Sequence, residues 1–374
     1  MRILIACDSY KDALSALEVC RAIGRGIAAA STHAECRLFP MSDGGEGLGE
    51  ALSYHLGLRQ TALEVSDPLF RRITACYGIS EDGSVAFIEM AQASGLQLLT
   101  PAERNPMHTT TYGVGELIRH VISCCGARRI VVGLGGSATN DAGIGMAQAL
   151  GFSILDDKGR AVQPVGRALK SVAGIIPPTN WPLNIQYEAM CDVTNPLYGP
   201  QGAAYVYSPQ KGASPAEVAT LDEGLRHIAG LSAHYDELAQ QPGAGAAGGL
   251  GFGLTAFLGA TLRSGIDLLM DLTGFDAQID WADVVITGEG RLDGQSSQGK
   301  LVSGISRRAL QKQKPVIALC GALDATPSDL TNMGITAAFS ITPKPCTLEQ
   351  AIAYTARNLE FTAFQVGRVL CCRL

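Results

Sequence analysis

The sequence has few charged residues and lacks the best-known signatures of nucleotide-binding and hydrolytic proteins. Charged residues make up 17% of 374 positions, the net charge is −6 and no basic run occurs, which argues against a nucleic-acid partner. No apolar run approaches about 18 residues, so we expect no membrane-spanning helix. The G-x-x-x-x-G-K-[ST] loop, the protein-kinase signatures and a legible Ser-His-Asp arrangement are missing. These absences exclude the most familiar classes of ATP-binding protein and hydrolase.

Disulfide and zinc frameworks are also missing, although the chain has 11 cysteines. Their number is odd, and neither a C-x-x-C pair nor a zinc-ligand spacing occurs. Cys7, Cys191 and Cys320 lie in apolar runs, where cysteine behaves as a small hydrophobic residue. The start MRILIACDSY has five apolar residues before Asp8, too few for a signal peptide. We therefore expect a reduced, cytoplasmic protein.

The two ends of the chain carry alternating strand and helix patterns. Apolar strand patterns occur at residues 2–7, 34–40, 282–287, 315–320 and 337–342. Helices are predicted to begin near Ser15, Asp43, Lys300, Thr326 and Thr347, three of them (Ser15, Thr326 and Thr347) at capping boxes. Such βαβ alternation predicts a parallel sheet.

The middle of the chain differs from both ends. Residues 59–90 read as three strands joined by short turns, which predicts antiparallel hairpins. The glycine-rich stretch 240–253, QQPGAGAAGGLGFG, is typical of a linker or a mobile loop, and we expect residues 242–253 to move if the domains close. We predict an α/β fold of two domains, with the active site in the cleft.

The first predicted domain is a doubly wound parallel-sheet domain made from both chain ends, residues 1–66 plus 262–374. The second is an inserted mixed α/β domain, residues 67–261, with antiparallel hairpins at its start. Two sequential domains are the alternative.

One glycine-rich stretch, GLGGSATNDAGIGMAQALG from Gly133 to Gly151, follows a strand pattern. Gly133-x-Gly135-x-x-Ala138 fits a dinucleotide-binding turn, and Asp156 lies near the spacing of a ribose-binding acid. The motif is weak, because GRGIAA at 24–29 fits it inside a predicted helix. The stretch also carries four polar residues that a dinucleotide turn does not need: Ser137, Thr139, Asn140 and Asp141.

Acidic residues follow apolar runs at five places in the chain. They are Asp8, Asp43, Asp141, Asp192 and the pair Glu289 and Asp293. Each alone is well explained as a helix cap or a turn residue. Together they predict a shared acidic cleft, which suits Mg²⁺ and phosphate. Backbone amides of GLGGS and DGGEG at helix N-termini, with the loop lysines Lys11, Lys211 and Lys300, would hold phosphate oxygens.

Taken in order, these segments resemble the glycerate kinase family, of the bacterial type that phosphorylates D-glycerate. The resemblance covers nearly the whole chain, through DSYKDALSALE, DGGEG, IEMAQASGL, NPMHTTTYGVGELI, GLGGSATNDAGIGMAQALG, CDVTNPLYGPQGAA, PQKGA, PGAGAAGGLGFG, SGIDLLMDLTGFD, VITGEGRLDGQSSQGK and NLEFTA. It implies ATP and Mg²⁺, two α/β domains with the site between them, and a product that is 2-phosphoglycerate. The chain departs from the family where Cys7 replaces a proline, Tyr10 a phenylalanine and Asp12-Ala13 a Gly-Ser pair.

Site roles follow from the chemistry that phosphoryl transfer requires, namely positioning and charge neutralisation. The catalytic candidates are Asp192, Asp43, Asp8 and Lys11. The substrate- or phosphate-binding candidates are Ser9, Gly44, Gly45, Gly135, Gly136, Ser137, Thr139, Asn140, Arg291, Gln295 and Lys300. The metal-ligand candidates are Asp192, Asn195, Asp141, Glu289 and Asp293. Arg291 is expected to pair with a substrate carboxylate in a bidentate manner.

Three other functions stay open at this point. They are phosphorylation of glycerate at the 3-hydroxyl, a nicotinamide-dependent hydroxy-acid dehydrogenase, and a non-catalytic sensor of a hydroxy acid. In each case the expected partner is a small molecule, with neither nucleic acid nor membrane. Whether the chain forms a homodimer is left open.

Overall fold

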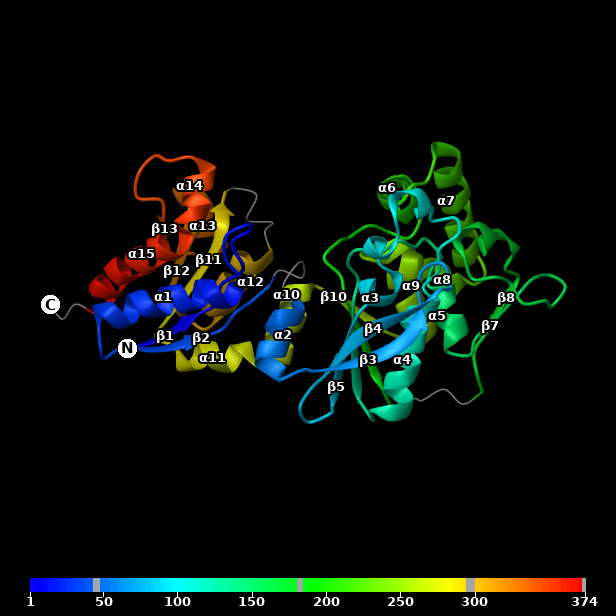
Figure 1. Cartoon of the computed structure of the whole chain (residues 1–374), viewed down its shortest axis with the longest axis horizontal. Coiled ribbons are helices and arrows are strands. Elements are labelled where there is room, and N and C mark those ends of the chain that lie inside the picture. The colour runs from blue at the N-terminus through cyan, green and yellow to red at the C-terminus, as the bar shows by residue number, and fades with distance from the viewer. Residues whose placement is uncertain (43–47, 180–183, 294–299, 372–374) are drawn as a thin grey trace. The chain divides into compact units, whose positions relative to one another are not determined.

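The computed structural model describes residues 1–42, 48–179, 184–293 and 300–371. The chain forms two compact units: unit 1 is Met1–Leu56 with Gly265–Leu374, and unit 2 is Gly57–Ser264 (Figure 1). Unit 1 holds a parallel sheet made from both chain ends, and unit 2 holds a mixed sheet. The predicted α/β fold class is therefore confirmed, while the shared cleft stays a prediction.

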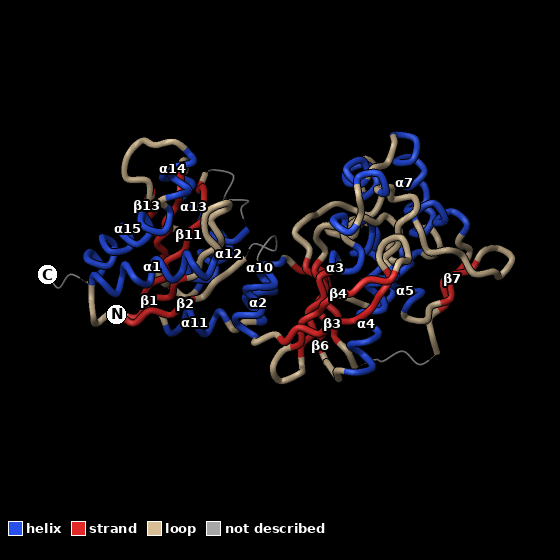
Figure 2. Tube along the Cα trace, viewed as in Figure 1, coloured by secondary structure: helices blue, strands red, loops and turns tan. Residues whose placement is uncertain are grey.

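Unit 1 is built on a five-stranded sheet in the order β13-β12-β11-β1-β2, in which every pair is parallel. The strands, red in Figure 2, are β1 (Arg2–Ile5), β2 (Glu35–Leu38), β11 (Val284–Leu292), β12 (Val316–Leu323) and β13 (Ala337–Ser340). The chain leaves β1 toward β2 on one side and leaves β11 toward β12 on the other. The boundary between β1 and β11 is thus a topological switch point, where open α/β sheets bind ligands.

Helices cover both faces of this sheet. They are α1 (Ala16–Ala30), α2 (Leu48–Leu56), α10 (Gly265–Leu272), α11 (Phe275–Trp281), α12 (Lys300–Gln311), α13 (Pro327–Met333), α14 (Leu348–Ala353) and α15 (Thr355–Leu370). The helices α1 and α15 lie side by side over one face, where Ile23 and Leu359 are buried against Ile5 (Figure 1). The predicted capping boxes at Ser15, Thr326 and Thr347 are confirmed.

Unit 2 is built on a six-stranded sheet in the order β10-β9-β6-β5-β4-β3. Its strands are β3 (Arg59–Ser66), β4 (Arg72–Ile79), β5 (Val85–Glu89), β6 (Arg129–Gly133), β9 (Gln186–Met190) and β10 (Thr261–Arg263). The pairs β3–β4 and β4–β5 are antiparallel, so the predicted hairpins are confirmed, and the other pairs are parallel. The predicted boundary at residue 66 falls one strand later than the division at Leu56, because β3 pairs with β4 along its whole length.

Along the chain, the α-helices of unit 2 occur between these strands, and two further strands form a small separate sheet. The helices are α3 (Ala91–Ser94), α4 (Tyr112–Cys124), α5 (Ile144–Ala149), α6 (Ala203–Tyr207), α7 (Pro215–Ala229), α8 (Ala233–Ala239) and α9 (Ala246–Leu258). The additional strands are β7 (Ser153–Leu155) and β8 (Gly174–Ile176), and they pair antiparallel. In the part of the chain that the structure describes, every helix is too short or too polar to cross a bilayer.

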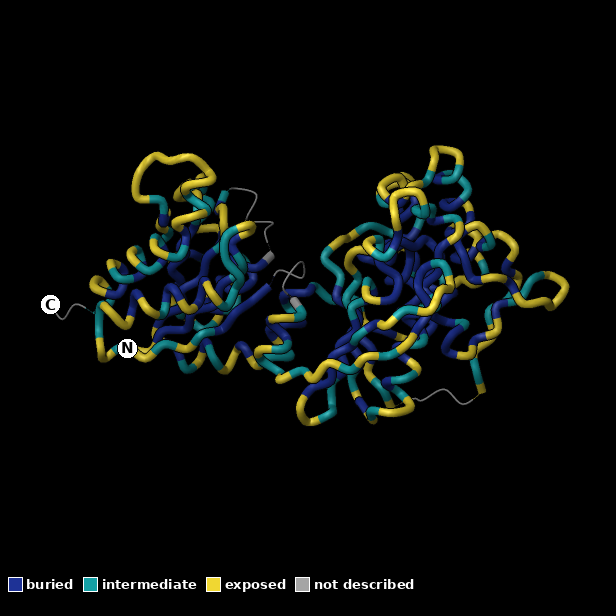
Figure 3. Tube along the Cα trace, viewed as in Figure 1, coloured by how far each residue is buried: buried dark blue, intermediate teal, exposed yellow. Residues whose placement is uncertain are grey.

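The prediction that residues 240–253 form a linker or mobile loop is wrong. Residues Ala246–Leu258 form α9, which is buried along nearly its whole length and belongs to the dark-blue interior of unit 2 in Figure 3. Its glycines allow close packing: a Cβ at Gly248 would lie 1.9 Å from the carbonyl oxygen of Thr139, and one at Gly253 would lie 2.7 Å from that of Ala142. The glycines therefore bring α9 against the turn after β6.

Candidate active site

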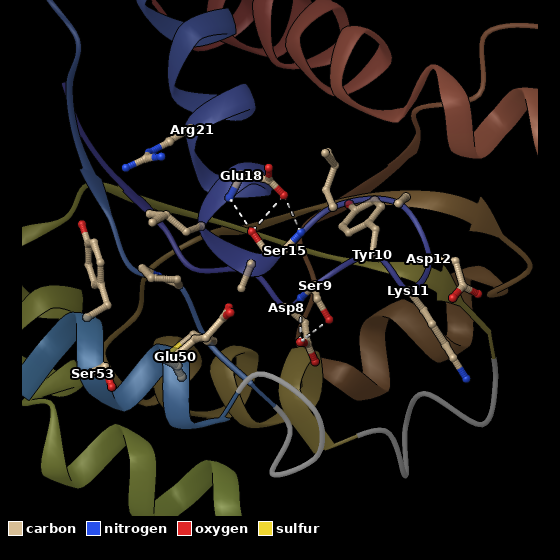
Figure 4. Close-up of a pocket in the computed structure, with 18 residues that line it drawn as sticks. Asp8, Ser9, Tyr10, Lys11, Asp12, Ser15, Glu18, Arg21, Glu50 and Ser53 are labelled. Atoms are coloured by element: carbon tan, nitrogen blue, oxygen red, sulfur yellow. Dashed lines mark hydrogen bonds between the residues drawn. The ribbon is translucent and has the colours of Figure 1, made fainter. Parts of the chain in front are cut away.

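A cavity of about 880 Å³ lies in unit 1 at the carboxyl end of β1 (Figure 4). The loop after β1 contributes Asp8, Ser9 and Lys11 to its wall, and α2 contributes Glu50. This is the rim beside the topological switch point, where ligands of open α/β sheets bind. The structure thus places three of the predicted site residues on one cavity.

The loop after β1 is held in place by Tyr10. The Tyr10 hydroxyl donates to the carbonyl oxygen of Leu319 in β12, and burial raises the pKa of Tyr10 well above its usual value, so the phenol stays a donor. Gly288 leaves room for this contact, because a Cβ there would lie 2.6 Å from the Tyr10 hydroxyl. At the tip of the loop, Asp12 has φ 61°, a conformation in which the glycine typical of the family would be unstrained.

Asp8 directs the first turn of this loop. Its Oδ1 accepts hydrogen bonds from the backbone nitrogen of Ser9 at 2.6 Å and from the Ser9 hydroxyl at 3.3 Å. Lys11 follows from the same loop and is exposed on the cavity wall (Figure 4). The loop therefore presents carboxylate, hydroxyl and ammonium groups to the cavity, which Asp12 lines as well as Asp8.

Glu289 and Asp293 belong to the same rim of unit 1. The backbone nitrogen of Asp8 donates to the carbonyl oxygen of Gly288 at 3.4 Å, so Glu289 follows directly from the contact between the two strand ends. Asp293 comes directly after β11 ends at Leu292. The predicted delivery of carboxylates to one rim thus applies to these three acids of unit 1.

Arg291 has partners on the protein itself. Its guanidinium lies 2.8 Å from Asp324 and 3.3 Å from Asp293, and the side chain is 65% exposed. A bidentate pair with a substrate carboxylate would have to replace these exposed ion pairs, which are individually weak.

Several candidates lie outside the described residues. Asp43, Gly44, Gly45 and Gln295 are among them. Lys300 begins α12, but its side chain is likewise outside the described part of the chain.

In unit 2, the turn after β6 contains the remaining glycines of the prediction. The expectation that the GLGGS amides lie at a helix N-terminus is wrong, because α5 begins only at Ile144. Instead, two backbone nitrogens at the ends of this segment donate to backbone carbonyl oxygens. Leu134 donates to Met190 in β9, and Ala138 donates to Ser94 in α3. Gly135 and Gly136 are exposed, and Gly136 has φ 67°.

Asp141 holds the end of this turn. It is fully buried and accepts four hydrogen bonds, from the backbone nitrogen and hydroxyl of Thr111 at 2.8 and 2.9 Å and from the backbone nitrogens of Gly143 and Gly145 at 3.1 and 3.3 Å. Burial raises the pKa of Asp141, and these hydrogen bonds act in the opposite direction. The carboxylate therefore organises the backbone, and its geometry does not favour the predicted role as a metal ligand.

Lys211 joins the same turn from the last residue of the short 3-10 helix Pro209–Lys211. It is 2% exposed, and its Nζ donates to the Ser137 hydroxyl and to the carbonyl oxygen of Thr139, both at 2.7 Å. Burial lowers the pKa of Lys211 to about 7, while the negative charge of Asp141 acts to raise it. The sequence predicted Lys211 as a loop lysine that supplies positive charge to a phosphate; its burial was not predicted, because no local pattern signals it.

Asn140 and Thr139 are also fully buried in this turn. The Asn140 Oδ1 accepts from the Ser208 hydroxyl at 3.1 Å. Its Nδ2 is buried, and among the described residues it has no hydrogen-bond partner. The Thr139 hydroxyl lies 3.5 Å from the carbonyl oxygen of Ala247 in α9.

Asp192 and Asn195 follow β9 in unit 2. Asp192 is half-buried just beyond the strand end. The Asn195 side chain donates to the carbonyl oxygen of Gln201 at 2.8 Å and accepts from the Tyr207 hydroxyl at 2.6 Å. Asn195 therefore shapes the following loop, whereas Asp192 stays a candidate for chemistry.

The predicted acidic places do not share one sheet. Asp8, Glu289 and Asp293 belong to unit 1, whereas Asp141 and Asp192 belong to unit 2. Among the described residues, no group of three or more His, Cys, Asp and Glu side chains is arranged to hold a metal ion. Mg²⁺ usually takes only one or two protein carboxylates together with phosphate oxygens, so a smaller set suffices.

Asp156 does not support the dinucleotide interpretation. It follows β7 in the small two-stranded sheet, and its carboxylate lies 2.7 Å from the guanidinium of Arg160 in a tight turn. A ribose-binding acid would have to lie at the rim that carries the glycine turn.

Comparisons with a family model, with named relatives and with a solved structure agree with one another. A family model described as the glycerate kinase family matches residues 3–371. A Bacillus cereus protein named glycerate kinase is 44% identical over 373 residues, covering 99% of this chain and 98% of the relative. An Escherichia coli protein named glycerate 2-kinase is 42% identical over 366 residues, covering 96% and 95%. The crystal structure of a candidate glycerate kinase 2 from Salmonella typhimurium LT2 has a TM-score of 0.87 and 43% identity, covering 99% of this chain and 98% of that one.

Proposed function

Because this chain belongs to the glycerate kinase family and is thus a kinase, we propose that it transfers the γ-phosphoryl group of ATP to the 2-hydroxyl of D-glycerate with the help of Mg²⁺. The observation that carries the proposal is the cavity at the carboxyl end of β1 in unit 1, with Asp8, Ser9 and Lys11 on its wall. Phosphoryl transfer requires positioning and charge neutralisation, and this wall offers the groups for both.

Lys11 would neutralise phosphate charge in this mechanism. Its ammonium group is exposed on the cavity wall, so a phosphate can approach it without a change in the fold. The Ser9 hydroxyl, next to it in the loop, would donate to a phosphate oxygen. Tyr10 would keep both side chains in place through its bond to Leu319.

The oxygen ligands that Mg²⁺ prefers are available at the rim of unit 1. Asp8, Glu289 and Asp293 carry carboxylates there, and Asp8 lines the cavity. One or two of these carboxylates, together with phosphate oxygens, would hold the metal. When bound, Mg²⁺ supplies positive charge to the phosphate oxygens of ATP.

The general base is proposed to be Asp192, with Asp8 and Asp43 as the other candidates. A base must come within hydrogen-bond reach of the hydroxyl whose proton it takes. Asp192 lies just beyond the carboxyl end of β9, in the parallel part of the sheet of unit 2. An Asp192→Asn variant should therefore lose turnover at saturating MgATP. If Asp192→Asn and Asp43→Asn both kept wild-type turnover, this assignment would be wrong.

The 2-hydroxyl is favoured as the acceptor because the related Escherichia coli protein is named glycerate 2-kinase. Transfer to the 3-hydroxyl is the second candidate, since the side chains alone do not discriminate the two hydroxyls. The dehydrogenase interpretation is weakened by the position of Asp156 in an exposed turn with Arg160.

A coupled assay for ADP release tests the proposed function. We expect ADP release that requires D-glycerate, ATP and Mg²⁺ together, and that stops when the metal is chelated. Binding of D-glycerate without ADP release would indicate a sensor. Binding of NADH without binding of ATP would indicate a dehydrogenase.

A further inference from the structure

Lys211 is a buried ammonium group whose hydrogen-bond partners are neutral. It is 2% exposed, and it donates to the Ser137 hydroxyl and to the carbonyl oxygen of Thr139. An ammonium group has three donors, so a third remains beyond these two bonds. Burying a cation without a carboxylate in direct contact is costly, and such groups are concentrated at functional sites.

A second buried donor lies in the same turn. The Asn140 side chain is fully buried, its Oδ1 accepts from the Ser208 hydroxyl, and its Nδ2 has no hydrogen-bond partner in the described part of the chain. Asn140 directly follows Thr139, whose carbonyl oxygen accepts from Lys211. A buried donor that lacks a protein partner is rare in native proteins and calls for an acceptor from outside the chain, an ordered water or a ligand.

The turn is accessible from solvent at one end. Gly135 and Gly136 are exposed, and Ser137 is 8% exposed beside them. The Ser137 hydroxyl accepts from Lys211, so its own hydrogen is available to a ligand. The turn begins at the carboxyl end of β6, whose parallel neighbours are β5 and β9.

From these contacts we propose that Ser137, Asn140 and Lys211 form the binding site for the carboxylate of the hydroxy-acid substrate. This inference rests on the proposed function and adds a subsite to it. All three side chains can donate to a carboxylate oxygen, with the Lys211 ammonium giving the charge-assisted bond.

The charge of the turn favours a carboxylate over the phosphates of ATP. Lys211 contributes at most one positive charge, and the negative charge of the buried Asp141 already acts on it. A ligand with one negative charge can be matched by this lysine, whereas a triphosphate brings several charges. Phosphate charge would be matched better at the unit 1 cavity, where Lys11 lies on the wall and the proposed function places Mg²⁺.

The test replaces Lys211 by methionine, which keeps the volume of the side chain and removes its charge. We expect Lys211→Met to raise KM for D-glycerate by about 10- to 100-fold, the range for loss of a hydrogen bond to a charged group. KM for MgATP should stay within about twofold of wild type, because that subsite is separate. Glyceramide, the neutral amide analogue of glycerate, should show by calorimetry a smaller loss of affinity in Lys211→Met than D-glycerate does, because only the bond to glycerate joins two charges.

Lys170→Met is the matched control. Lys170 is an exposed lysine of the same unit, paired with Glu223 at 2.7 Å, and its replacement should change none of these constants. Ser137→Ala is the second variant, in which only one hydroxyl is lost and KM for D-glycerate should rise by about three- to tenfold. Thermal unfolding shows that each variant compared is folded.

Two results would overturn the carboxylate site. One is a folded Lys211→Met or Ser137→Ala variant with wild-type KM for D-glycerate. The other is a rise in KM for MgATP in place of that for glycerate, which would make the turn a phosphate site. If the wild-type protein released no ADP with glycerate, the proposed function would fail separately. Calorimetry of D-glycerate binding to the wild type and to Lys211→Met would then still test the site.

Discussion

The loop after β1 and the turn after β6 both follow a buried parallel strand, yet they differ in how their polar residues are used. In the loop, Asp8 and Lys11 line an open cavity. In the turn, Asp141 and Lys211 are buried and bonded to their own unit. Residue types alone therefore do not show which group lines an open cavity and which is bonded inside its own unit.

Replacement of the two aspartates should give the largest contrast. Asp141→Ala leaves the backbone nitrogens of Thr111, Gly143 and Gly145 buried without their acceptor, so we expect a loss of about 3 kcal/mol or more in the free energy of unfolding. Asp8→Asn should lose activity but stay within about 1 kcal/mol of wild-type stability. Urea denaturation with activity assays measures both. Equal stability losses in the two variants would remove the distinction between loop and turn.

Replacement of Lys11, in the loop after β1, should change activity without changing stability. Lys11→Met removes an exposed positive charge from the cavity wall, and we expect kcat to fall by about 100-fold, as when a group that stabilises developing charge is removed. The melting temperature should stay unchanged, because the side chain is exposed. Lys158→Met, at another exposed lysine, is the control. Wild-type kcat in Lys11→Met would show that this lysine does not meet the transferred phosphate.

The packing of α9 against the turn can be tested with two glycines that share one backbone conformation. Gly248 and Gly259 both have φ 68°, but a Cβ at Gly248 would meet the Thr139 carbonyl oxygen at 1.9 Å, whereas one at Gly259 meets nothing within 4 Å. We expect Gly248→Ala to cost about 2 kcal/mol more than Gly259→Ala, because only the first adds overpacking to backbone strain. Chemical denaturation gives both values. Equal losses of stability in the two variants would mean that backbone strain alone sets the loss, and that the close approach of α9 to the turn does not contribute.

The pH dependence of stability reports on the burial of Lys211. Folded Lys211 has a pKa of about 7, lowered by burial from the ordinary value of 10.5. Between these two values the unfolded chain binds one proton more, so this lysine makes stability rise with pH, by up to about 1.4 kcal/mol per pH unit. The difference in stability between wild type and Lys211→Met should therefore shift in favour of the wild type from pH 7 to pH 9. A difference that is independent of pH would contradict the burial of the charge.

Local patterns were sufficient to predict the framework and the exposed loop. The capping boxes at Ser15, Thr326 and Thr347 begin helices as expected. Asp8 and Lys11 were found because strand ends are visible in the sequence and loop side chains there face a cavity. These features depend on neighbours within a few residues.

The interior of unit 2 could not be predicted in the same way. Residues 240–253 were interpreted as flexible because glycine allows motion, but Gly248 packs against Thr139, which is far away in the chain. The burial of Lys211 likewise depends on Ser137 and Thr139. Contacts of this range follow from the assembled sheet and not from a local pattern.

Phosphorus NMR of the reaction product tests the central claim most directly. Wild-type protein incubated with D-glycerate, ATP and Mg²⁺ should convert ATP to ADP and give one new phosphomonoester signal, that of 2-phosphoglycerate. A signal of 3-phosphoglycerate would contradict the assigned hydroxyl, and the lack of any glycerate-dependent phosphomonoester would contradict the proposed activity itself.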